Sequence, residues 1–434
     1  MPTRRFFRFL SLVSCLLSLV LILSACTHSR FFGQKEEQIT LEYWGLWESP
    51  TVMTVLINDY KATHPNINIS YKKRAREQYR ETLEAQIQTG KGPDIFRFHN
   101  TWTPMLKEEL APAPASIIPS SDFKKDFYSV ANSDLKIAGK VVGVPLGLDG
   151  LALYYNEDIF KAAGITKPPA TWTEFAQTAA KLTVRDTAGN IRTAGAAIGT
   201  ASNVDHFSDI AAVMIMQNGG ELKSPTDKQS IDAVDYYTKF AKGQNRVWDE
   251  TMPASTVAFA GGNLAMYFGP SWRAIEFKNA NPLLKFKTVP IPQLEGGKVT
   301  WASYWAEGVS TGSAHQQEAW KFLKYLSSEE VLVKFYSEAA KSPGRFFGEP
   351  YPRVTMAAKL ATDPIVGAYI SQAPFARSFP MATRTFDNGL NDQIIKAYED
   401  AINSIGKGTA TKSALETVAK NITSIINRYN ASPQ

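Results

Sequence analysis

The stretch ITLEYWGLWESPTVMTVLINDYKATHPNINISYK (residues 39–72) contains the pattern that decides the fold. It opens with alternating apolar and polar residues, which is typical of a half-buried β-strand. Ser49 and Pro50 then supply an N-cap and a first-turn proline for a helix with one apolar face. His64-Pro65 ends that helix, because the residue before a proline disfavours the helical conformation. The remaining residues predict a second strand, so the stretch forms a strand–helix–strand unit.

The same order continues along the chain. Residues 79–90 predict a helix that Gly90 stops, and residues 94–99 predict a third strand. Farther on, residues 151–156 predict a strand, and Thr171 with Glu174 forms a capping box for a further helix. Strands that alternate with helices in this way predict an α/β fold with mostly parallel sheets.

LAMYFGPSWR (264–273) predicts a buried strand that is stopped by Gly269-Pro270 and followed at once by Trp272. In open α/β sheets, ligands bind in the crevice beyond the carboxyl ends of the strands. We therefore expect Trp272 to line a binding cleft. The alternative is that the Trp272 ring has a structural role and packs at the edge of its own domain.

The first 25 residues carry the features of a secretion signal. Three arginines precede an apolar stretch over residues 9–23, which is short for a bilayer-spanning helix. It ends in LSAC (23–26), which resembles the bacterial lipobox, in which the cysteine is lipidated and becomes the new N-terminus. We expect an exported protein, either periplasmic or held at the outer face of the cell membrane by lipid on Cys26, with 26–38 as a polar tether. A short N-terminal anchor with an incidental cysteine is the alternative.

Charge and cysteine content exclude several classes of function. The formal net charge of +6 falls to +3 when the three arginines of residues 1–25 are removed, which does not favour a nucleic-acid partner. Only two cysteines occur, Cys15 and Cys26, so the mature chain has no internal disulfide and no thiol-based metal site. The five histidines are dispersed without metal-ligand spacing. We expect neither a metal nor a cofactor.

Five motifs together resemble a known family. They are GKGPDI (90–95), GKVVGVPLGLDGLALYYNEDIFKAAGI (139–165), PPATWTEF (168–175), AFAGGNLAMYFGPSW (258–272) and EAWKFLKYLSSEE (318–330). In this order, over nearly the whole mature chain, they resemble the maltose-binding-protein-like solute-binding proteins of ATP-driven (ABC) importers.

The resemblance implies a fold of the type II periplasmic-binding-protein class. In this fold, two α/β lobes are joined by hinge strands with a ligand cleft between them. It places residues 39–148 and 308–345 in the N-terminal lobe, and residues 149–307 and 346–430 in the C-terminal lobe. The chain would cross between the lobes near Leu148, Gly308 and Phe346.

Candidate ligand contacts come from the ends of predicted strands and from positions that match the family pattern. The acid before the strand at 151–156 lies at a predicted hinge, where family members often place a ligand-contacting acid. Trp301, Tyr304 and Trp305 of WASYWAEG (301–308) would narrow the cleft, which argues against a long oligosaccharide. The candidates are Trp47, Glu48, Tyr79, Phe98, Asn100, Asp149, Asn203, Trp272, Trp301, Tyr304 and Arg345.

The function implied is that of a monomeric binding protein, not an enzyme. It would capture a mono- or short oligosaccharide and deliver it to an ABC transporter permease. Aromatic faces cover the apolar face of a sugar, and nearby Asp, Glu and Asn bind its hydroxyl groups. A secreted carbohydrate-active hydrolase is the rival, since its two acids can come from distant segments. Within the binding class, Arg97, Arg273 and Arg345 would suit a sugar phosphate, whereas acids beside aromatics would suit a polyamine.

Overall fold

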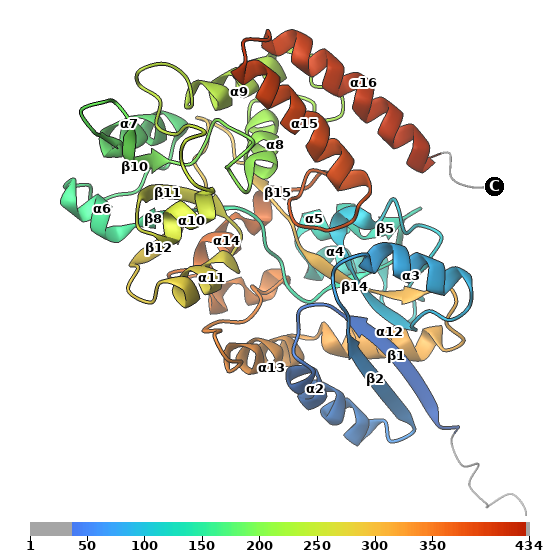
Figure 1. The fold of residues 1–434 in the computed structure, drawn as a ribbon. Helices are drawn as coiled ribbons and strands as arrows, with labels where there is room; N and C mark the ends of the chain where they lie inside the picture. The colour runs from blue at the N-terminus through green and yellow to red at the C-terminus, as the bar shows by residue number, and fades with distance from the viewer. Residues whose placement is uncertain (1–36, 431–434) are drawn as a thin grey trace, which may run out of the picture.

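The computed structural model describes residues 37–430, except for the side chain of Asn430. It contains two α/β lobes, which lie at the lower right and the upper left of Figure 1. The predicted signal peptide, Cys26 and the tether up to residue 36 lie outside the described residues. No helix within the described residues is long and apolar enough to cross a membrane.

The first lobe is built on a six-stranded sheet. In spatial order its main strands are β2 (Ile67–Lys73), β1 (Ile39–Gly45), β3 (Ile95–His99), β14 (Trp305–Ser310) and β4 (Leu110–Ala111), and β7 (Val144–Pro145) also pairs with β14. Strand β1 is parallel to both β2 and β3, which confirms the predicted strand–helix–strand units. Strand β14 runs antiparallel to β3 and comes from far along the chain. It begins at Trp305, so the first sheet includes residues that we placed before the crossing at Gly308.

Helices cover the faces of this sheet. The longer ones are α2 (Pro50–Thr63), α3 (Tyr79–Gln88), α12 (Gln316–Leu326) and α13 (Glu329–Ala340); shorter pieces are η1 (Asn100–Trp102), α4 (Ser120–Asp126), α5 (Ser129–Asp134) and η2 (Val354–Lys359). Helix α2 begins as predicted, with the Ser49 side chain accepting a hydrogen bond from the Thr51 amide and Pro50 in the first turn. Its apolar face, including Leu56 and Tyr60, is buried. A small hairpin, β5 (Lys136–Ile137) and β6 (Lys140–Val141), completes this region.

The second lobe has a five-stranded sheet. In spatial order its strands are β12 (Phe286–Val289), β8 (Ala152–Asn156), β11 (Leu264–Gly269), β10 (Ile191–Ala196) and β9 (Val184–Arg185). Its helices are α6 (Glu157–Ala162), α7 (Trp172–Leu182), α8 (Phe207–Gln217), α9 (Lys228–Lys239), α10 (Ser255–Ala260), α11 (Arg273–Ala280) and α14 (Gly367–Gln372). The capping box of Thr171 and Glu174 is present at the start of α7. The strand predicted at 264–268 is β11, and all its residues are buried.

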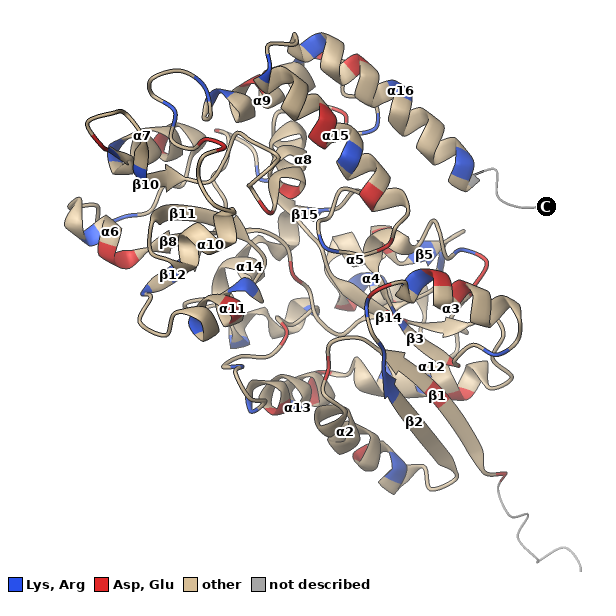
Figure 2. Ribbon diagram, viewed as in Figure 1, with Lys and Arg blue, Asp and Glu red and all other residues tan. Residues whose placement is uncertain are grey.

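The C-terminal part of the chain lies across the second lobe and reaches the first. After η3 (Ala373–Phe375), strand β15 (Ala376–Arg377) pairs with β13 (Thr300–Trp301). Helices α15 (Leu390–Gly406) and α16 (Thr411–Asn430) pack on each other and on α9. Figure 2 shows acidic and basic residues on both helices, and on α15 they alternate. The division of the chain into lobe segments stays a prediction.

Candidate ligand-binding site

A cavity of about 340 Å³ lies where the two lobes meet. Its walls come from the ends of β1, β3 and β14 in the first lobe and from the loop after β11 and helix α11 in the second. Two further segments close it: residues 146–149, where the chain passes from one lobe to the other, and residues 383–386, which precede α15. The cavity therefore has the position expected for a ligand cleft beyond strand ends.

The first-lobe wall carries a cluster of rings. The Trp305 ring lies edge-on to Trp47, His99 and Trp102, with centroid separations of 5.4, 5.1 and 5.2 Å. Burial lowers the pKa of His99 to about 3, so this imidazole is neutral. Its two ring nitrogens lie within hydrogen-bond distance of the Thr101 and Ser303 hydroxyls. These contacts hold the rings in place before any ligand arrives.

A buried ion triad supports this wall. Arg97 donates through Nε to Glu307 Oε1 at 2.6 Å, and its Nη1 pairs with Glu48. All three side chains are buried. Burial raises the pKa of Glu307 to about 7, although Arg97 opposes the shift. Arg97 is thus committed to two carboxylates and is not a free binding group.

The second-lobe wall is centred on Trp272, which directly precedes α11. Its ring lies edge-on to His206 at 6.1 Å, and the guanidinium of Arg273 lies 4.5 Å from its centroid. Arg273 donates to Glu276 Oε2 at 2.6 Å and to His206 Nε2 at 3.1 Å. The Trp272 ring is partly exposed to the cavity, as a stacking platform requires.

Asp149 lies at the junction of the lobes. Its carboxylate accepts hydrogen bonds from the Ser271 amide (3.0 Å) and hydroxyl (2.7 Å) and from the Gly150 amide (2.8 Å). Burial nevertheless raises its pKa to about 7, and the charge of Glu349 adds to the shift. Glu349 itself pairs with Arg345 at 2.9 Å. Asp149 therefore couples the hinge segment to the loop that carries Trp272.

The segment before α15 has an unusual backbone. Arg384 and Phe386 have φ angles of 61° and 56°, in the left-handed region that non-glycine residues rarely adopt. Both side chains line the cavity. The guanidinium of Arg76 lies 4.5 Å from the centre of the Phe386 ring, and Arg384 lies 3.6 Å from Asp205.

The structure brings five of the predicted residues together at the cavity. These residues are Trp47, Asp149, Trp272, Tyr304 and Arg345. The hydroxyl of Tyr304 also donates to Asp134 at 3.0 Å. Whether these side chains contact a ligand stays a prediction.

Three other predicted residues are buried behind the first-lobe wall and do not line the cavity. Glu48 belongs to the ion triad, and the Tyr79 hydroxyl donates to the Arg97 carbonyl at 2.9 Å. Phe98 is fully buried, since side chains alternate along β3 and its neighbours Arg97 and His99 point to the cavity.

The remaining three are held by internal hydrogen bonds. Asn100 donates to Asp134 at 2.8 Å and accepts from the Tyr304 amide at 3.1 Å. Asn203 donates to the carbonyls of Asp249 and Met252, and it accepts from Trp248 Nε1.

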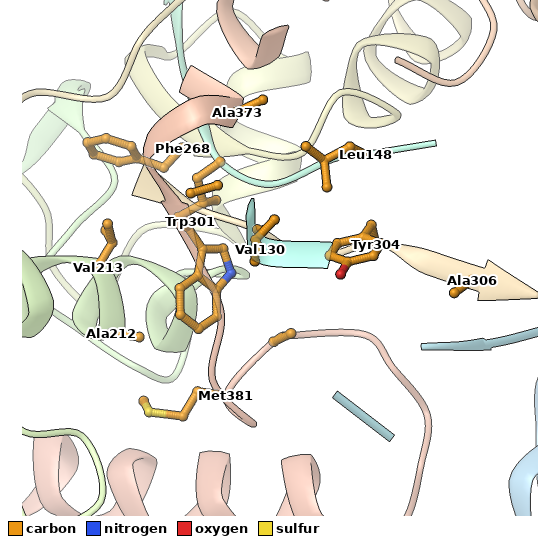
Figure 3. Packing of buried hydrophobic residues seen from close by; sticks show 14 of the residues in the cluster. Val130, Leu148, Ala212, Val213, Phe268, Trp301, Tyr304, Ala306, Ala373 and Met381 are labelled. Atoms are coloured by element: carbon orange, nitrogen blue, oxygen red, sulfur yellow. The ribbon is translucent and has the colours of Figure 1, made fainter. Parts of the chain in front are cut away.

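Trp301 is buried away from the cavity. Figure 3 shows its indole packed among apolar side chains that include Val213 and Met381. Its Nε1 donates to Asp209 Oδ1 at 2.7 Å. Trp301 therefore does not narrow the cavity as we expected, whereas Tyr304 and Trp305 of the same motif line it.

Several cavity residues were missed. Among them are Arg76, Glu276, Glu349, Thr383, Arg384 and Phe386. Most lie in segments where the sequence predicted no strand, and their approach depends on how distant parts of the chain pack. The sequence pattern gave no signal for them. Within the described residues, no group of three or more His, Cys, Asp or Glu side chains is arranged to hold a metal ion.

Fold and cavity together define a class: two-lobed α/β proteins that bind a small solute between their lobes. A family profile described as bacterial extracellular solute-binding protein matches residues 55–344. The chain belongs to this bacterial extracellular solute-binding protein family.

Individual relatives are distant in sequence and close in fold. The multiple sugar-binding protein of Streptococcus mutans is 23% identical over 332 residues, which cover 73% of this chain and 77% of that protein. Among solved structures, the sugar-binding protein MalE of Xanthomonas citri has a TM-score of 0.72 at 19% identity, covering 90% of this chain and 98% of that one. A solute-binding protein of an ABC transporter from Thermotoga lettingae, bound to alpha-D-tagatose, has a TM-score of 0.68 at 22% identity, covering 89% and 99%.

Proposed function

We propose that this protein binds a carbohydrate in the cavity between its lobes and delivers it to the permease of an ABC importer. The observation that carries the proposal is the arrangement of rings at the cavity. Trp47, Trp305 and Phe386 face it together with Trp272, and polar groups lie between them. Aromatic faces cover the C–H surface of a sugar ring while carboxylates and hydroxyls bind its hydroxyl groups.

Names of relatives support the same ligand class. The Streptococcus mutans relative is a multiple sugar-binding protein, and the Thermotoga lettingae structure holds alpha-D-tagatose. A cavity of about 340 Å³ suits a mono- or short oligosaccharide.

The acids of the cavity favour binding over hydrolysis. Glycoside hydrolysis uses two carboxyl groups as acid, base or nucleophile. Here Glu276 and Glu349 are each held in an ion pair with an arginine, at 2.6 and 2.9 Å. Asp149 accepts three hydrogen bonds and belongs to the hinge contact. None of the three is placed as a free acid–base pair.

Export and lipid anchoring at Cys26 form part of the proposal. The family is extracellular, and residues 1–26 have the form of a lipoprotein signal. Acyl chains contribute about 0.8 kcal/mol per buried CH₂, so several chains hold a protein on the bilayer. Labelling cells with a fatty-acid analogue should mark the wild type but not Cys26→Ala; an unlabelled wild type would refute the anchor.

A thermal-shift screen with mono- and disaccharides tests the central proposal. A ligand at about 100 times its dissociation constant stabilises the fold by about 2.7 kcal/mol, which raises the melting temperature measurably. The same saccharides offered as aryl glycosides should not be hydrolysed. Turnover would favour the hydrolase, and a screen in which polyamines alone stabilise the protein would replace the carbohydrate.

A further inference from the structure

Two arginines at the cavity, Arg384 and Arg76, make no hydrogen bond through their terminal nitrogens to any residue within 37–430. Arg97 and Arg345 each donate through a terminal nitrogen to a carboxylate. Arg384 instead has its nearest acid, Asp205, at 3.6 Å, and it donates no hydrogen bond to any residue within 37–430. Its side chain is 40% exposed. The guanidinium of Arg384 therefore faces the cavity without a hydrogen-bonded partner in the described part of the chain.

The carboxylate of Asp205 already accepts hydrogen bonds from other residues. Its Oδ2 accepts hydrogen bonds from the Ser255 hydroxyl and from the amide and hydroxyl of Thr256, at 2.9, 2.9 and 2.5 Å. Its Oδ1 lies 3.9 Å from Nη2 of Arg273, a buried nitrogen without a hydrogen-bond partner in the described part of the chain. One carboxylate oxygen is thus shared by two guanidinium groups and hydrogen-bonded to neither.

Arg76 is the second arginine whose terminal nitrogens make no hydrogen bond in the described part of the chain. Its guanidinium stacks near Phe386, and its Nε donates to the exposed Glu77 at 3.0 Å. Within the described residues its two terminal nitrogens have no hydrogen-bond partner. Stacking fixes the plane of a guanidinium and leaves its N–H edge available, the geometry that suits a planar carboxylate.

The backbone conformation that brings Arg384 and Phe386 to the cavity is energetically unfavourable. A left-handed conformation is sterically unfavourable for a non-glycine residue, and Arg384 and Phe386 both adopt it. Strain of this kind persists where the surrounding structure enforces it, often at a ligand site. Here it places both side chains on the cavity wall, with Arg76 opposite.

Closure of the lobes would remove water from Arg384. A guanidinium that loses water without gaining a hydrogen-bonded partner is unfavourable, so an anion on the ligand would stabilise the closed site. We propose that the ligand is an acidic saccharide, whose carboxylate binds Arg384 and the stacked Arg76. This inference rests on the proposed function and specifies the charge of its ligand. The arginines considered from sequence, Arg97, Arg273 and Arg345, each donate through a terminal nitrogen to a carboxylate instead.

Calorimetric titration with matched pairs of sugars tests the inference. The probes are galacturonate and galactose, glucuronate and glucose, mannuronate and mannose, and the disaccharides digalacturonate and galactobiose. One uronate should bind at least tenfold more tightly than its neutral counterpart, and this preference should shrink as salt rises. Arg384→Gln should lower the affinity for that uronate 10- to 100-fold and leave the neutral counterpart within twofold. Arg76→Gln should act in the same direction.

Controls separate the possible failures. Arg192→Gln removes an exposed arginine outside the cavity and should change no affinity. If neutral sugars bind as tightly as uronates, the acidic ligand is wrong while the carbohydrate proposal stands. If Arg384→Gln weakens both members of a pair equally, Arg384 acts through Asp205, and the inference is wrong. If glucose 6-phosphate binds more tightly than every uronate, the carboxylate is wrong; if no saccharide binds, both proposals fall.

Discussion

The two walls of the cavity differ in how firmly their side chains are held. On the first-lobe wall, Trp305 packs against three rings, and Arg97 is bonded to two buried carboxylates. On the opposite side, the Trp272 ring contacts the His206 ring and the Arg273 guanidinium. Arg384 lies 3.6 Å from Asp205, whose carboxylate already accepts hydrogen bonds from other residues. The rings and the ion triad of the first wall are held by more contacts than Trp272 and Arg384 on the second.

This difference suggests a division of labour. A preformed wall binds the ligand at little cost in ordering its side chains. A wall with a guanidinium that lacks a hydrogen-bonded partner gains most when ligand and closure supply one. Ligand can shift the lobes toward closure only through such differential affinity. We therefore expect substitutions on the first wall to change stability, and those on the second to change affinity.

The largest effect should come from the ion triad. Arg97→Met leaves Glu48 and Glu307 buried without their counter-ion, which should lower the free energy of unfolding by about 3–5 kcal/mol. Urea denaturation measures the change. Arg345→Met is the matched control, because its pair with Glu349 is partly exposed and should contribute about 1 kcal/mol or less. Equal losses in the two variants would show that the triad gives the first wall no special rigidity.

The tryptophans provide the next test. Trp272→Ala should weaken saccharide binding by roughly 2–4 kcal/mol, the range of a buried anchor at an interface, and should cost little stability. Trp305→Ala should instead lower stability by about 3 kcal/mol, because its ring fills the space among Trp47, His99 and Trp102. Titration and thermal unfolding of both variants decide the matter. A large stability loss in Trp272→Ala with unchanged affinity would remove Trp272 from the site.

The sequence predicted the elements that local patterns determine more completely than the parts of the cavity that distant segments form. Periodicity and caps identified β1, α2, β2 and the start of α7, because local patterns determine them. Residues directly after strands, such as Trp47 and Trp272, were expected at the cavity and line it. Strand alternation was harder to resolve, so Phe98 was chosen where its neighbour His99 faces the cavity.

The rest depends on packing between distant segments. Arg384 and Phe386 reach the cavity through a left-handed backbone conformation. No local sequence pattern predicts it, because glycine or asparagine is the usual residue in this conformation. Trp301 and Trp305 belong to one short motif, yet β13 turns the first toward Asp209 while β14 turns the second toward the cavity. The sequence alone could not distinguish them.

Asp149, between the walls, should make stability depend on pH. Its pKa is raised from 3.8 to about 7, so the folded state keeps a proton that the unfolded state has lost. Its contribution to stability is therefore present below about pH 4 and is lost as pH rises toward 7. Asp149→Asn keeps the shape and the hydrogen-bond acceptor but removes the titration. Between pH 5 and pH 8 the wild type should lose roughly 1–2 kcal/mol more than the variant, a value discounted for water in the cavity.

Chemical denaturation at several pH values measures that difference. Gln in place of Glu349 provides the control, because Glu349 adds to the shift of Asp149 through its charge and should reduce the pH dependence only in part. Parallel pH profiles for the wild type and Asp149→Asn would show that Asp149 is ionised throughout the range and that the three hydrogen bonds outweigh burial.

The smallest effect concerns the strained segment of the second wall. Asn388 continues the left-handed pattern with φ 46°, and its amide donates to Asp392 at 2.9 Å. Glycine adopts this conformation without a steric penalty but loses more entropy on folding, so Asn388→Gly should raise stability by about 0.5 kcal/mol or less. Asn388→Ala keeps the backbone N–H and the Cβ but removes the short polar side chain that lets asparagine tolerate this conformation, and it should lower stability by about 1 kcal/mol. The gap between the two variants in urea unfolding measures strain directly. If glycine and alanine behave alike, the backbone there is relaxed, and the second wall differs from the first only in its unpaired side chains.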